Sequence, residues 1–284
     1  MLKKSFNILK NNMIFIQPVL IWQAVFFIVM YVSAERIQLP PVRLLMYFSI
    51  VMLFILCLAG WFHINKLAVL GYDEKDDENK ITEKALENFK KFFEGVGENC
   101  TKIICSSLLL AALYIAAFIG IFQAGLNYFG MPEFIKELAQ TAPFGNSEQL
   151  AAYFSKISET DALIFAKWTI LINSVLCILN FFALLYFAAA NFENKNFIIS
   201  FFKAVKLFIS NFFSSVYIML YAFMIFLAVN FAINQAALIF GVNAFIFSLF
   251  VILNTIYFNY YVLLVFCFYY DKTKKAEDNC SSRG

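Results

Sequence analysis

The feature that most constrains this chain is a run from Phe212 to Tyr270 in which no residue carries a charge. A helix that crosses a bilayer needs ~20 consecutive apolar residues, so this run is long enough to cross twice. Hydrophobic residues make up 62% of the chain and charged residues only 14%. A water-soluble domain of this size could not bury so much apolar surface. We therefore expect an integral membrane protein.

Uncharged apolar stretches predict six spans, at residues 13–33, 44–62, 103–125, 163–190, 212–234 and 245–269. They leave an external loop at 126–160 and a tail at 271–284, within a single membrane domain that covers 1–284. The last two spans should join through a tight hairpin at Asn234–Asn243. Backbone groups in lipid must be satisfied within each segment, and the stretches lack the alternation of barrel strands. The sequence thus predicts an all-α integral membrane protein with six transmembrane helices.

The basic residues predict the orientation. Seventeen of the 22 Lys and Arg fall in the N-terminal tail, the second and fourth connections and the C-terminal tail. Because positive loops stay in the cytoplasm, we expect the inner membrane of a bacterium with both termini cytoplasmic. A net charge of +3 is too small to indicate nucleic acid. The partners to expect are membrane lipids, with other membrane proteins as a further option.

Three segments on the cytoplasmic side repeat one apolar spacing. Their apolar residues step by four, three and four positions: Leu2, Phe6, Leu9 and Met13; Ala85, Phe89, Phe92 and Val96; Phe201, Val205, Phe208 and Phe212. This spacing predicts amphipathic helices that lie in the membrane interface. Each precedes a pair of spans, which favours an internal repeat of three units, although any amphipathic helix shows such spacing. The middle unit fits least well, because a polar linker, Gly97–Lys102, is expected before its first span.

The external loop carries signals of two short helices, Met131–Gln140 and Ser147–Ile157, with Thr160–Asp161 capping the fourth span. A lid or docking surface is one interpretation of this loop. Helices lying on the outer leaflet are the other.

Residues suited to catalysis are few. The predicted spans contain no Asp or Glu, and the single histidine, His63, is expected to anchor the second span at the interface. Lys167 should reach outward to the interface beside Trp168. The acidic residues from Asp73 to Glu78 lack the spacing of a calcium loop. We therefore expect no enzyme activity, no catalytic residue, no metal site and no cofactor.

What the spans do carry is amide side chains. The candidate intramembrane polar contacts are Gln17, Gln23, Asn173, Asn180, Asn230, Asn234 and Asn254. Amides in lipid usually hydrogen-bond between helices, which would hold the bundle together. The alternative is a polar cavity that they line.

Two segments also suggest a family. Ser5–Asn12 (SFNILKNN) runs into the first span, and Phe201–Lys206 (FFKAVK) precedes the fifth. In these features the chain resembles bacterial six-helix membrane proteins related to the membrane domain of glycerophosphoryl diester phosphodiesterases. The resemblance implies a six-helix bundle, but no stretch could hold the phosphodiesterase domain, so it implies no catalytic residue. The expected function is a membrane scaffold or accessory subunit; the alternative is a permease or lipid-handling protein with an amide-lined cavity.

Overall fold

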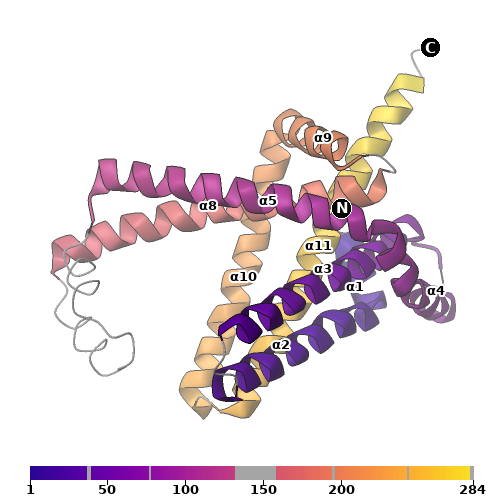
Figure 1. The fold of residues 1–284 in the computed structure, drawn as a ribbon. Helices are drawn as coiled ribbons and strands as arrows, with labels where there is room; N and C mark the ends of the chain where they lie inside the picture. Colours follow the sequence, from indigo (N-terminus) through magenta and orange to yellow (C-terminus); the bar gives the residue numbers. More distant parts are fainter. Residues whose placement is uncertain (37–39, 77, 132–157, 194–195, 242, 282–284) are drawn as a thin grey trace. The chain divides into compact units, whose positions relative to one another are not determined.

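The computed structural model describes residues 1–36, 40–76, 78–131, 158–193, 196–241 and 243–281 (Figure 1). These residues form helices and connecting segments, without a β-strand among them. Six helices are long and apolar enough to cross a membrane. The predicted class, an all-α membrane protein with six spans, is confirmed.

The long helices extend beyond most of the predicted span limits. They are α2 (Gln17–Arg36, preceded by the 3-10 turn η1, Met13–Ile16), α3 (Pro40–Leu70), α5 (Phe92–Phe129), α8 (Glu159–Phe192), α10 (Phe212–Phe240) and α11 (Ala244–Ser281). Three shorter helices are α1 (Leu2–Asn11), α4 (Glu78–Lys90) and α9 (Phe197–Ser210). We call these three the short helices.

Each short helix is separated from the following helix by one residue that leaves the helical conformation. Asn12 (φ −127°, ψ 38°) ends α1, and Asn211 (φ −123°, ψ 34°) ends α9. The two side chains act alike, because Asn12 Nδ2 donates to Ile8 O at 2.8 Å and Asn211 Nδ2 donates to Leu207 O at 3.2 Å. Each amide therefore donates to a carbonyl of the last helical turn, which stabilises the break. The short helices are separate elements and not extensions of the spans.

The middle segment differs from the prediction. The break lies at Lys91, so Phe92 and Val96 of the predicted amphipathic helix belong to α5. The predicted linker Gly97–Lys102 does not exist, since α5 is helical through it. Polar side chains do not interrupt backbone hydrogen bonding, and here Asn99 packs on α3 instead of marking a loop.

Two helix ends also differ from expectation. The predicted break at Asn234–Asn243 begins only after Phe240, where Gly241 adopts φ 72°, a conformation that favours glycine. Asn234 therefore lies inside α10. The cap of α8 is Ser158 rather than Thr160–Asp161, because the Asp161 backbone N–H donates to Ser158 Oγ at 3.1 Å. Apart from Met131, the two helices predicted in the external loop lie outside the described residues.

The chain packs as two compact units, and the single membrane domain stays a prediction. Unit 1 comprises Met1–Leu108 and Phe181–Gly284, and unit 2 comprises Leu109–Asn180. In unit 2, Trp168 Nε1 donates to Gly130 O at 2.8 Å, and the Trp168 ring lies against Gly125. Lys167 is exposed, with Nζ 5.9 Å from the centroid of the Phe129 ring. These contacts fasten α5 to α8 within unit 2.

Candidate functional site

The carboxyl-terminal parts of three long helices form the core of unit 1. They are Leu58–Val69 of α3, Phe181–Phe192 of α8 and Asn259–Tyr269 of α11, and we call them the central helix ends. Most of their residues are buried on every side of the helix. The Phe62 ring lies 5.1 Å from that of Phe187 and 5.6 Å from that of Phe266, measured between centroids. Because a helix buried on all sides needs neighbours all round, this region is a packed core and not a surface.

One lysine of each short helix pairs with a carboxylate that follows a central helix end. The pairs are Lys4 of α1 with Asp271 (3.6 Å), Lys84 of α4 with Asp76, and Lys203 of α9 with Glu193 (2.5 Å). We call them the three lysine ties. The ties of α4 and α9 join segments close in the chain, whereas the tie of α1 joins the first helix to the last. Ion pairs near a protein surface contribute little to stability, so their main effect is to orient the short helices.

Two further contacts link the same region. Lys66 Nζ donates to Asn191 O at 2.7 Å, which places a cation at the carboxyl end of α8, where the helix dipole is negative. Tyr269 Oη donates to Glu193 Oε1 at 3.0 Å. The Glu193 carboxylate therefore accepts from both α9 and α11.

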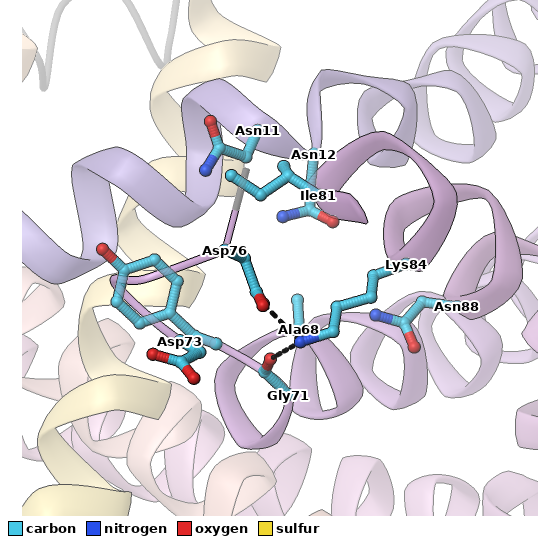
Figure 2. A pocket seen from close by; sticks show the side chains of 10 residues that line it. Asn11, Asn12, Ala68, Gly71, Asp73, Asp76, Ile81, Lys84 and Asn88 are labelled. Carbon is cyan, nitrogen blue, oxygen red and sulfur yellow. Dashed lines mark hydrogen bonds and ion pairs between the residues drawn. The ribbon is translucent and has the colours of Figure 1, made fainter. Parts of the chain in front are cut away.

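Asp76 is the most enclosed member of the three ties, with a side chain that is only 4% exposed. Hydrogen bonds from Lys80 and from Lys84 lower the pKa of Asp76 below its usual value. Figure 2 shows Lys84 reaching both Asp76 and the carbonyl of Gly71, which it meets at 3.1 Å. The adjoining cavity, beside Asn12 and Asn88, has a volume of about 30 Å³. It has room for a water molecule or two and not for a larger solute.

His63 is buried, contrary to the expectation of an interfacial ring. Its side chain is 6% exposed, because Gly95 and Asn99 of α5 lie against it. Asn99 Nδ2 lies 3.2 Å from His63 Nδ1, within hydrogen-bonding distance. Glu98 lies 3.8 Å from the same nitrogen. His63 therefore joins α3 to α5.

Two glycines make that contact possible. A Cβ on Gly95 of α5 would collide with Cβ and Cγ of His63, and a Cβ on Gly60 of α3 would lie 2.7 Å from the carbonyl oxygen of Phe92. The two helices thus cross at a distance that only glycine permits at these positions.

Two of the seven predicted amides bond between helices. Gln23 Oε1 of α2 accepts from Thr255 Oγ1 of α11 at 3.0 Å. Asn180 Oδ1 of α8 accepts from Tyr114 Oη of α5 at 2.7 Å, within unit 2.

The other five amides do not meet at one place. Asn173, Asn230 and Asn254 donate to carbonyls one turn back in their own helices, those of Thr169, Phe226 and Phe250. Gln17 and Asn234 are exposed. None of the seven lines the cavity beside Asp76.

Sequence reasoning missed two buried amides of the central helix ends, Asn65 and Asn191. The Nδ2 atoms of Asn65 and Asn191 donate to the carbonyls of Trp61 and Phe187, each one turn earlier in the same helix. Their Oδ1 atoms have no hydrogen-bond partner among the described residues. Both lie just beyond the predicted span limits at residues 62 and 190, and therefore outside the predicted spans. The lysine ties were missed for a different reason, since spacing alone does not pair α1 with α11.

No protein-family model, curated protein or solved structure matches this chain.

Proposed function

We propose that the protein lies in the cytoplasmic membrane of a bacterium with both termini in the cytoplasm. The unequal distribution of Lys and Arg supports this orientation. It is also supported by the exposed lysines on the short helices, Lys3 and Lys10 of α1, Lys90 of α4 and Lys206 of α9. Such lysines suit the negative surface of a cytoplasmic leaflet.

The three-unit repeat remains part of the proposal. Its units would be α1 with α2 and α3, α4 with α5 and α8, and α9 with α10 and α11. The similar conformations of Asn12 and Asn211 and the lysine tie of each short helix support it. The break at Lys91, one turn earlier than the repeat requires, is the main departure.

We propose that the protein is a non-enzymatic membrane scaffold or accessory subunit that works through contacts between its helices and other membrane proteins. The observation that carries this proposal is the packing of the central helix ends, where Phe62, Phe187 and Phe266 fill the space between three helices. A permease needs a polar path through its helices, and aromatic packing favours a static support instead. Large exposed apolar residues, such as Leu45 (65%) and Leu238 (79%), offer surface to lipid or to a partner.

Site-specific photocrosslinking in native membranes tests this function. Benzoylphenylalanine placed at Leu45 of α3 or at Leu238 of α10 should give discrete adducts with one or a few membrane proteins. The matched control is Leu263, which is fully buried and should crosslink only within the chain. Lipid adducts alone at both exposed positions, together with solute uptake by vesicles that contain the pure protein, would contradict the scaffold and support the permease.

A further inference from the structure

A groove opens in unit 1 where the start of α10 meets the later part of α11, beside Met1. The groove has a volume of about 370 Å³, which is in the range of small-molecule binding sites. Its walls are mainly apolar, formed by Phe213, Tyr217, Ile218 and Phe268. Phe213 is 87% exposed and Tyr217 is 59% exposed, while Ile218 and Phe268 are buried and form the inner wall. An apolar groove with an open side suits a long apolar chain.

One charged side chain lies at this groove. Among the side chains of the described residues that line it, that of Lys272 is the charged one. Its Nζ lies 5.9 Å from the centroid of the Phe268 ring, so the ammonium group stands next to the apolar wall. The neighbouring carboxylate, Asp271, is already paired with Lys4. The groove therefore combines apolar walls with positive charge.

Charge complementarity decides the occupant. The groove belongs to a chain with six helices that can span a membrane, and Phe213 and Tyr217 are in the first two turns of one of them, α10. At such a position an apolar groove meets acyl chains, and a lysine beside it meets phosphate. A lipid with net negative charge gains more from this lysine than a zwitterionic lipid does.

We propose that this groove binds one anionic phospholipid, with an acyl chain against Phe213 and Tyr217 and its phosphate at Lys272. The lipid would occupy the leaflet in which α10 begins. This proposal does not depend on the scaffold function, because an ordered lipid could equally support a permease.

Native mass spectrometry of the full-length protein released from detergent tests the site. The probes are palmitoyl-oleoyl phosphatidylglycerol and the zwitterionic palmitoyl-oleoyl phosphatidylethanolamine, each titrated into the detergent. Wild type should retain one phosphatidylglycerol in preference to phosphatidylethanolamine. Lys272→Gln should weaken phosphatidylglycerol binding about five-fold, the effect of one lysine near a lipid surface. Binding of phosphatidylethanolamine should change little.

Two further variants keep the test sharp. Lys274→Gln removes a charge two residues along the same helix, beside the Tyr270 ring and outside the groove lining, and should leave the preference unchanged. Ser214→Trp fills the groove while retaining Lys272, and should abolish retention of the lipid. Equal losses in the Lys272 and Lys274 variants would indicate general surface attraction and overturn the proposal. Normal binding by Ser214→Trp would overturn it as well.

Discussion

The crossing of α3 and α5 makes a sharp prediction about one glycine. Replacing Gly95 by Ala adds a single methyl group where it would overlap Cβ and Cγ of His63. These are the atoms nearest the α3 backbone, and no side-chain rotation moves the Cβ of His63 away. The two helices must therefore separate, which also disturbs the contact between His63 and Asn99.

The magnitude follows from two opposing effects. Overpacking a well-packed contact costs typically about 1–3 kcal/mol. Replacing glycine by alanine inside a helix returns about 0.5–1 kcal/mol, because glycine is a poor helix former. Gly95→Ala should therefore lower the free energy of unfolding by up to about 2.5 kcal/mol.

Gly97→Ala is the matched control. It lies in the same helix two residues later, and a Cβ built there meets nothing within 4 Å. Only the helix-propensity effect remains, so this variant should be neutral or stabilised by up to about 1 kcal/mol. Reversible unfolding of the purified protein in mixed micelles, followed by circular dichroism, measures both changes. If the two variants shift in the same direction by similar amounts, the close crossing of α3 and α5 is refuted.

Three other predictions test different parts of the molecule. Asp76→Asn should reduce stability at neutral pH and make stability less dependent on pH in the acid range. The pKa of Asp76 is lowered in the folded state, so its contribution to stability is complete above the ordinary aspartate pKa and is lost as the pH falls through the folded-state pKa. Thermal unfolding measured across a series of acid pH values tests this. Val205→Glu should destabilise the protein by about 2–3 kcal/mol if α9 buries that face at hydrocarbon depth. Lys206→Glu, at an exposed position, should cost little in the same unfolding assay. Equal costs for the two variants would contradict an interfacial α9. In a cysteine-free background, Ser147→Cys should react with an impermeant thiol reagent in intact cells and Asn79→Cys should not, and the opposite pattern would reverse the proposed orientation.

The membrane spans were predictable because hydrocarbon imposes a strong condition on composition. Twenty apolar residues without charge have few alternatives to a spanning helix, so all six spans could be recognised. Helix ends were less predictable. Polar residues such as Asn99 and Asn234 are typical of loops, yet both lie inside helices, where their backbone hydrogen bonds continue the helix.

Contacts between distant segments were the least predictable. His63 was expected to anchor the second span at the membrane interface, because the sequence gives no sign that Gly95 brings α5 against it. The pairing of Gln23 with Thr255 likewise joins helices far apart in the chain. The many amides in the predicted spans indicated that hydrogen bonds would form between helices. Which amides form them depends on how the helices pack.

The tie between Lys4 and Asp271 has a consequence for the order of assembly. Because α1 precedes α11 in the chain, their contact can form only after all the intervening spans have been synthesised. Until then α1, with its buried residues Ile8 and Leu9, can pack only on elements made earlier, such as α3 and α4. Loss of α11 would therefore deprive α1 of a packing partner that lies more than two hundred residues away in the chain.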